Sequence, residues 1–209
     1  MLDFQQFTSI FVAALALALI PGPDTLLILG RSMTSGRTIG MATGAGTVLG
    51  LVVHTITAAL GLSAILMTSS VAFSVVKFLG AAYLIYLGIQ ALRSPPLDLD
   101  HPEHKPITAS QALLQGMLSN VFNPKVALFF LSFLPQFVRP EHQQVTVQFL
   151  LLGLVVMGVV LMYNVGLALL SGTVREFMRK RPAFLRWQNR TMAGVFVALG
   201  IKLAFTSQN

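Results

Sequence analysis

Long apolar segments recur along the whole chain and alternate with short polar ones. A helix needs about 20 mainly apolar residues to cross a bilayer, and most of these segments reach that length. We therefore predict an all-α integral membrane protein with six transmembrane helices and a single domain, residues 1–209. The expected spans are Phe4–Leu29, Ile39–Met67, Val71–Leu92, Gln111–Val138, Val145–Leu170 and Thr191–Phe205.

The first span is broken by Pro21-Gly22-Pro23-Asp24. Proline inside a helix removes a backbone donor and clashes with the preceding turn, at about 3 kcal/mol or more. The span should therefore divide into two half-helices, with Gly22 as the N-cap of the second and Pro23 as its first residue. Asp24 then lies in the first turn, where the positive end of the helix dipole favours a carboxylate.

The fourth span is broken in an equivalent way by Asn123-Pro124-Lys125, and Lys125 follows Asp24 by 101 positions (125 − 24). Asn123 is a strong N-cap and Pro124 suits the first helical position. A lysine in that first turn is unfavourable with the dipole, and a substrate carboxylate would relieve it. Charges at this depth cost at least about 2.5–3.5 kcal/mol each and mark functional sites. Kinks that serve packing and a structural Asp24–Lys125 ion pair are the alternatives.

The two charges together predict a mechanism. A zwitterionic amino acid can enter the membrane only if both of its charges are met. Lys125 can hold the carboxylate, and Asp24 can hold either the ammonium or a proton. If ammonium and proton compete for Asp24, each expels the other, and that competition is an antiport cycle.

Three further polar residues stand out within apolar spans. His54, in the second span, is either a packing histidine bonded to a neighbouring carbonyl or hydroxyl, or a proton relay or substrate contact. Tyr163 and Asn164 are the main polar interruption of the fifth span and join the candidate substrate-binding residues. The other three histidines are in polar loops, so no metal site is expected.

The two halves of the chain resemble each other. Each has three spans and one broken helix, and Leu87–Gln90 at the end of the third span matches Leu199–Lys202 at the end of the sixth. We place repeat one at about 1–93, a linker at about 94–110 and repeat two at about 111–209. An odd number of spans per repeat forces the second repeat to insert upside down, and transporters of this design bind substrate at the repeat interface.

Glycines are concentrated at the start of the second span. Gly36, Gly40 and Gly44 recur every four residues, as do Gly46 and Gly50. Small residues at this spacing let membrane helices approach closely. The pattern predicts close packing of the second span.

Composition agrees with the membrane interpretation: 55% of the 209 residues are hydrophobic, 10% are charged, and the mean hydropathy is +0.76. Cysteine is absent, which excludes disulfides, thiol chemistry and cysteine metal sites. The first apolar segment is too long for a cleaved signal peptide and lacks a basic n-region, so the first span is expected to direct insertion.

Basic residues are distributed unevenly between the two sides. Ten lie in the segments after spans one, three and five, and three lie on the opposite side. The positive-inside rule puts the ten in the cytoplasm and both termini on the periplasmic side. The ten are Arg31, Arg37, Arg93, Lys105, Arg175, Arg179, Lys180, Arg181, Arg186 and Arg190; the three are Lys77, Arg139 and Lys202.

The segment Arg175–Arg190 interleaves its basic residues with aromatic and aliphatic ones. This pattern suits a segment that lies on an anionic membrane face. Nucleic-acid binding is the competing interpretation, and we discount it because the segment is short and held between two spans.

Five short motifs complete the sequence pattern: Ile20-Pro21-Gly22-Pro23-Asp24, Ser35-Gly36-Arg37, Phe78–Leu84, Asn123-Pro124-Lys125 and Phe133–Phe137. Together they resemble the LysE/RhtB family of amino-acid exporters over nearly the full chain. The resemblance implies a bacterial inner-membrane exporter of amino acids or close derivatives, driven by the proton gradient. Threonine, homoserine and homoserine lactone are substrates of the nearest relatives, and lysine and arginine of more distant members.

Some of these residues would also suit functions other than export. Asp24 and His54 would suit a metal or cation exporter of a related fold, although the missing cysteine argues against soft metals. An intramembrane enzyme would need a nucleophile and base set, for which Asp24, His54 and Lys125 are too few, so the chain is not expected to be an enzyme or to need a cofactor. A passive channel or structural protein is the third alternative, and a homodimer is compatible with the sequence.

Overall fold

The computed structural model describes residues 4–19, 21–62, 107–139 and 144–180, with single helical positions between 75 and 93 and between 183 and 205. Most of the predicted third and sixth spans, and the linker up to residue 106, lie outside the described residues. The α-helices are α1 (Phe4–Leu19), α2 (Pro23–Thr34), α3 (Arg37–Thr57), α6 (Ala109–Val121), α7 (Pro124–Leu128), α8 (Val145–Leu169) and α9 (Ser171–Lys180). Two π-helical turns, Ala58–Leu62 and Phe129–Phe133, and one 3-10 turn, Leu134–Phe137, continue α3 and α7.

The described elements confirm the all-α membrane class. The continuous helix Arg37–Gly61 and α8 are each long and apolar enough to cross a membrane. The pairs α1–α2 and α6–α7 meet the same criterion only when each is taken as one bent span, with bends of 57° and 51°. The six-span, inverted-repeat arrangement stays a prediction, because two of its spans lie outside the described residues.

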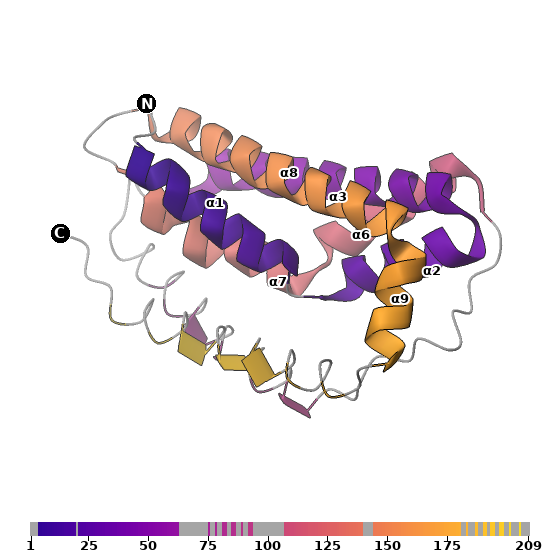
Figure 1. The fold of residues 1–209 in the computed structure, drawn as a ribbon. Helices are drawn as coiled ribbons and strands as arrows, with labels where there is room; N and C mark the ends of the chain where they lie inside the picture. The colour runs from indigo at the N-terminus through magenta and orange to yellow at the C-terminus, as the bar shows by residue number, and fades with distance from the viewer. Residues whose placement is uncertain are drawn as a thin grey trace.

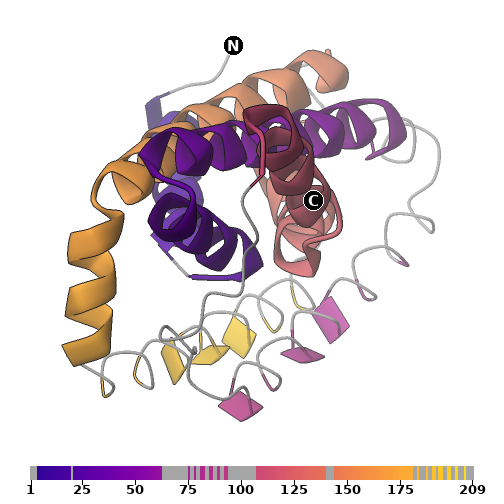
Figure 2. The same ribbon diagram turned by 90° about the vertical axis from the view of Figure 1, so that its right-hand side faces the viewer.

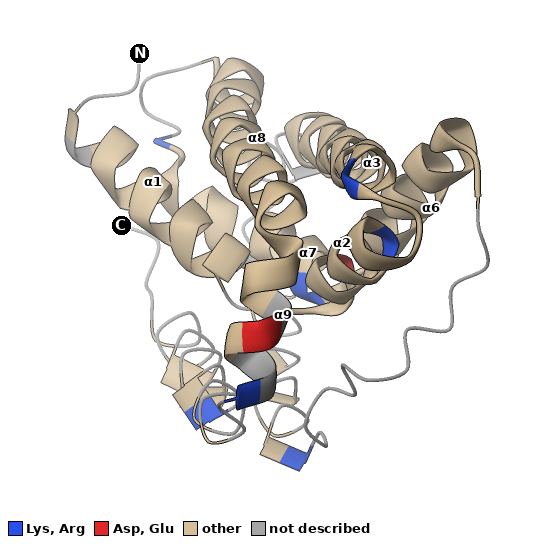
Figure 3. Ribbon diagram, turned by 45° about the vertical axis from the view of Figure 1, so that its right-hand side comes forward, with Lys and Arg blue, Asp and Glu red and all other residues tan. Residues whose placement is uncertain are grey.

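The two unbroken helices lie next to each other, and the broken helices pack against them. α3 and α8 run side by side in Figure 1, with α1 against α8 and α6 against α3. Figure 2 shows both broken helices on the same side of the α3–α8 pair. Their breaks therefore face a common interior, and Figure 3 shows charged positions at α2 and α7 within a mostly uncharged bundle.

Glycines bring α3 and α6 into direct backbone contact. A Cβ at Gly46 would overlap the carbonyl of Leu113, and a Cβ at Gly116 would overlap the carbonyl of Thr43. The predicted close approach of the second span is confirmed here, and α6 contributes a glycine of its own. This packing fixes the height of α6 relative to α3 and so positions the second break.

α2 continues to Thr34, five residues beyond the predicted end of span one at Leu29 (34 − 29). The polar residues of this last part find partners within the helix bundle. Ser32 Oγ donates to the carbonyl of Ile28 at 2.7 Å, and the side chain of Arg31 is buried against α6. Arg31 therefore belongs to the helix and not to the polar loop in which the sequence pattern placed it.

Candidate functional site

The first break has the predicted local structure. Gly22 is the N-cap of α2 with extended backbone angles (φ −142°, ψ −167°), and Pro23 occupies the first helical position. Asp24 is the acidic residue of the first turn. The carboxylate therefore lies at the positive end of the α2 dipole, as its position in the sequence predicts.

The second break is built in the same way and is capped more completely. The Asn123 side chain accepts a hydrogen bond from the backbone N–H of Lys125 at 3.0 Å, and Pro124 follows the cap. Asn123 is 2% exposed, so this cap is an internal part of the protein. Lys125 lies in the first turn of α7, as predicted.

The Asp24 carboxylate is held by side chains from the opposite broken helix. Ser119 Oγ donates to Oδ1 at 2.7 Å, while Asn120 Nδ2 and Asn123 Nδ2 donate to Oδ2 at 2.8 and 3.1 Å. All three donors are neutral and lie around the break between α6 and α7. They fix the carboxylate in place while its negative charge remains available to a cation.

The Lys125 ammonium reaches in the other direction, to the end of α1. Nζ donates to the carbonyl oxygen of Leu17 at 3.0 Å. This carbonyl is in the last turn of α1, where the dipole is negative and carbonyls lack partners within the helix. The sequence predicts an unfavourable interaction of Lys125 with the dipole of α7, and the structure shows that the end of α1 compensates for it.

Asp24 and Lys125 line one small cavity, and the structure describes no ion pair between these two side chains. The cavity measures about 30 Å³. That is room for one or two water molecules, and it is too small for an amino acid. The described conformation therefore holds the two opposite charges close to each other around a nearly closed centre.

Hydroxyl and amide groups form another wall of this cavity. Asn164 Nδ2 donates to Thr47 Oγ1 at 2.7 Å and to the carbonyl of Gly44 at 3.2 Å. Tyr163 is hydrogen-bonded to Thr25 on α2. Tyr163 and Asn164 therefore lie beside the two charges, as predicted site residues. The remaining lining residues are the polar Asn120 and the aliphatic Leu17, Ala18, Leu51, Val126 and Val160.

His54 is not among the residues that line the cavity. Its Nε2 lies 3.2 Å from the carbonyl oxygen of Asn120, and its ring stacks on Phe130 with 5.6 Å between centroids. The contacts match the packing alternative, in which the imidazole bonds a neighbouring carbonyl. Asn120 links His54 to the site, because its side chain also donates to Asp24.

Sequence reasoning missed the residues that hold the two charges. Ser119 and Asn120 are one turn before Asn123 on the same helix, and this spacing was a signal that could have identified them. The Leu17 contact had no such signal, because a backbone carbonyl belongs to every residue type. Thr47 lies among the glycines of α3, whose spacing already predicted close helix packing, so nothing in the sequence marked it as a site residue.

Within the described ranges, no three His, Cys, Asp or Glu side chains come together in a way that could hold a metal ion. Asp24 and His54, the pair considered for a cation exporter, are each bonded to Asn120.

Two bent helix pairs with opposite charges at their breaks are typical of membrane transporters. The profile of the family described as LysE type translocator matches residues 15–207, and the chain belongs to this family. The family resemblance drawn from the motifs is thereby confirmed.

Relatives cover almost the whole chain. An uncharacterized membrane protein of Pseudomonas aeruginosa is 31% identical and covers 97% of this chain and 96% of its own. A homoserine/homoserine lactone efflux protein of Salmonella typhi is 28% identical (97% and 98%), and a leucine efflux protein of Klebsiella pneumoniae is 29% identical (95% and 94%). No solved structure matches the chain.

Proposed function

We propose that this protein exports small amino acids, or close derivatives of them, across the bacterial inner membrane in exchange for protons. The observation that carries the proposal is the placement of Asp24 and Lys125 on one cavity, each in the first turn of a half-helix and each held by partners other than the opposite charge. A zwitterion offers a matching charge to each of them.

The named relatives support an ammonium as the common feature of the substrates. Homoserine, its lactone and leucine all carry an α-amino group, whereas the lactone has no free carboxylate. Asp24 is the residue suited to this shared group. Lys125 then distinguishes a free acid from a neutral derivative, and we take threonine, homoserine and other neutral amino acids as the first candidates.

Each charged group of the substrate competes with a group or ion that occupies the same place in its absence. The carboxylate competes with the Leu17 carbonyl for the Lys125 ammonium, and the substrate ammonium competes with a proton for Asp24. A proton arriving at Asp24 releases the ammonium, and export follows. Because no charge is left without a partner at any stage, the large cost of a bare ion in the membrane is avoided.

The cavity must widen to admit substrate, because about 30 Å³ holds only water. Widening at one side at a time would give alternating access around a fixed site, as inverted-repeat transporters do. The bias of basic residues puts both termini on the periplasmic side, and Arg175–Arg190 is expected to lie on anionic lipid at the cytoplasmic face.

Transport into inverted membrane vesicles tests the proposal. Vesicles containing the protein are supplied with labelled threonine, homoserine, leucine or lysine, with and without an acidic interior. We expect at least one neutral amino acid to accumulate when the gradient is applied. Uptake equal to that of vesicles lacking the protein, across the whole panel, would contradict the proposal.

A further inference from the structure

Arg31 is a buried cation that the proposed transport site does not use. Its side chain is only 6% exposed. Nε and Nη2 both donate to Gln115 Oε1, at 3.0 and 2.8 Å. Arg31 follows Asp24 by seven residues, which is about two helical turns or roughly 10 Å along the same face of α2. Both charges of α2 therefore face α6.

The contact partners of these two residues on α6 are four residues apart, which is about one helical turn. Gln115 binds Arg31, and Ser119 binds Asp24. Two polar links thus join α2 to α6, one at the transport site and one toward the predicted cytoplasmic end. Opening the seam between the two helices at that end requires the Arg31–Gln115 bonds to break.

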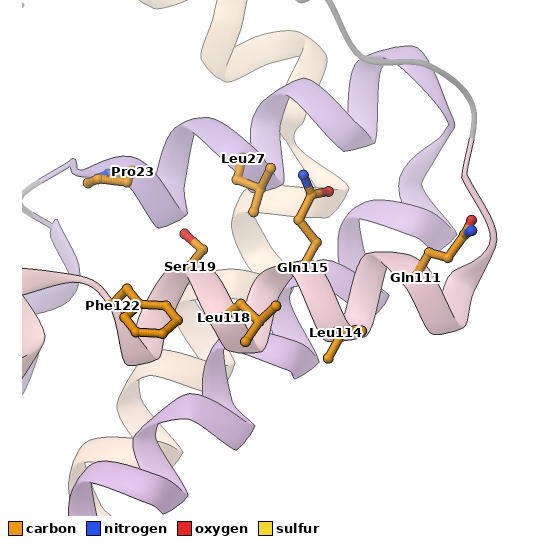
Figure 4. Close-up of a pocket in the computed structure, with 8 residues that line it drawn as sticks. All are labelled: Pro23, Leu27, Gln111, Leu114, Gln115, Leu118, Ser119 and Phe122. Carbon is orange, nitrogen blue, oxygen red and sulfur yellow. The ribbon is translucent and has the colours of Figure 1, made fainter.

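A groove of about 620 Å³ runs along this seam. Figure 4 shows Gln115 and Ser119 pointing toward α2, with Leu27 between them on the α2 side, while Leu114 points away. Ser119 lines the groove and also donates to Asp24. The groove therefore extends from the Arg31–Gln115 bonds to the wall of the transport site.

In the part of the chain that the structure describes, the buried apolar cluster near Arg31 is the smaller of two. Among the described residues, the larger buried cluster joins α1, α3, α8 and the segment after α7, with Phe130 and Phe149 at its centre. The cluster near Arg31 contains four buried residues, Ile28, Leu29, Leu167 and Ala168. This cluster joins α2 to α8 and contains no residue of α6, so moving α6 away from α2 at this end leaves it intact.

We propose that the Arg31–Gln115 contact is the inner gate of the transporter, and that the free α-carboxylate of the amino acid opens it by replacing Gln115 on the guanidinium. A carboxylate binds a guanidinium through two parallel charge-assisted bonds, which are about twice as strong as bonds to a neutral amide. The buried guanidinium keeps a partner throughout the exchange. The substrate then lies in the groove, roughly 10 Å from Asp24.

This inference rests on the proposed amino-acid export and narrows its substrate class. The first contact is between Arg31 and the substrate carboxylate, so the substrates of this chain are α-amino acids with a free acid group. Esters and lactones of the same amino acids carry the ammonium but lack the charge that exchanges with Gln115. They are expected to leave the gate closed.

A single introduced thiol can show whether the gate is open or closed, because the native sequence contains no cysteine that would be labelled as well. Leu27→Cys puts that thiol in the groove, where a membrane-impermeant maleimide labels it from the cytoplasmic side of inverted vesicles. Threonine, homoserine and leucine are added in turn, each beside its methyl ester. We expect at least one free acid to raise the labelling rate severalfold and its ester to leave the rate unchanged. Equal acceleration by acid and ester would overturn the proposal.

Substitutions of Gln115 separate a gate from a structural contact. Gln115→Glu replaces the amide with a carboxylate that the substrate cannot displace, so export and acid-stimulated labelling should fall at least tenfold while thermal stability holds or rises. Gln115→Met removes the bonds that join Arg31 to this position of α6, so the thiol should label rapidly without substrate. Gln144→Glu is the matched control, because Gln144 is an exposed N-cap residue of α8 outside the groove, where a carboxylate suits the helix dipole.

The outcomes keep this inference distinct from the proposed function. Absence of export by the native protein would count against amino-acid transport. Normal export by Gln115→Glu, in a protein that does transport amino acids, would overturn the gate alone.

Discussion

The Lys125 ammonium donates to the carbonyl oxygen of Leu17 at 3.0 Å, so a charge at the start of one half-helix caps the end of the other broken helix. Asp24 makes the reciprocal contact, from the start of α2 to the side chains at the end of α6. Each break thus supplies the partner of the other. This exchange is the relationship expected of two equivalent helices in an inverted repeat, and it holds the two charges on one cavity.

Lys125→Met should nearly abolish export while the protein remains inserted at normal levels. A hydrogen bond to a charged group contributes about 1.5–3 kcal/mol, which corresponds to a loss of about 10- to 100-fold in carboxylate binding. Initial rates of export from loaded cells, normalised to protein in the membrane, measure this loss. Near-native export by Lys125→Met would exclude Lys125 from binding the substrate.

Lys125→Arg should also be a poor transporter. A Cβ added at Gly22 would stand 3.4 Å from the Lys125 ammonium, so this backbone borders the charge closely. The planar guanidinium is wider than an ammonium and does not fit the same place. Retention of native export by Lys125→Arg would show that only the charge matters.

Gly22→Ala in the native background adds a methyl group beside the Lys125 ammonium and should lower the export rate.

His54→Gln should keep gradient-driven export within about threefold of the native rate. The histidine contacts the Asn120 carbonyl and Phe130, and a glutamine amide can donate to the same carbonyl while it cannot carry a proton at neutral pH. The assay compares uptake by inverted vesicles with and without a pH gradient. Loss of the gradient dependence in His54→Gln would make His54 a coupling residue after all.

Gly46→Ala and Gly116→Ala should each lower the thermal stability of the detergent-solubilised protein. The added methyl group would overlap a backbone carbonyl of the facing helix, and overpacking of this kind costs about 1–3 kcal/mol. Gly158→Ala is the matched control, because a Cβ at this α8 position meets no atom within 4 Å. Equal unfolding temperatures for Gly46→Ala and Gly158→Ala would contradict the close α3–α6 packing.

Reporter fusions test the predicted orientation. A reporter after Gln208 should be active only in its periplasmic form, and one inserted near Lys180 only in its cytoplasmic form. The expectation follows from the ten-to-three bias of basic residues between the two sides. A cytoplasmic C-terminus would reverse the assignment and would put the Arg31 end of α2 at the periplasmic face.

Local features of the breaks were predictable from the sequence, whereas their partners were not. Proline and the N-cap residues act on their own helix, so Asp24 and Lys125 could be placed in first turns from the sequence alone. Their contacts join positions 95 residues apart for Ser119 and 108 residues apart for Leu17. Such pairs depend on how far one helix slides along another, and this depends on the α3–α6 packing of the whole bundle.

Asp24 is the residue that we propose takes up the exchanged proton. Asp24→Asn tests this role with little change in structure. The asparagine oxygen can accept from the two amides that bind Asp24 Oδ2, and its NH₂ group can donate to the Ser119 hydroxyl, which also accepts. The substitution therefore keeps the shape and the hydrogen bonds of the site but removes the group that we propose takes up the proton.

The most direct measurement is substrate accumulation by inverted vesicles containing Asp24→Asn, with and without an imposed pH gradient. We predict that the gradient no longer drives accumulation, while slow exchange of labelled for unlabelled amino acid persists without it. Native vesicles, assayed in parallel, should concentrate the substrate when the gradient is applied. Asp24→Asn vesicles that still concentrate substrate in response to the gradient would contradict the account, because the proton would then enter through another group.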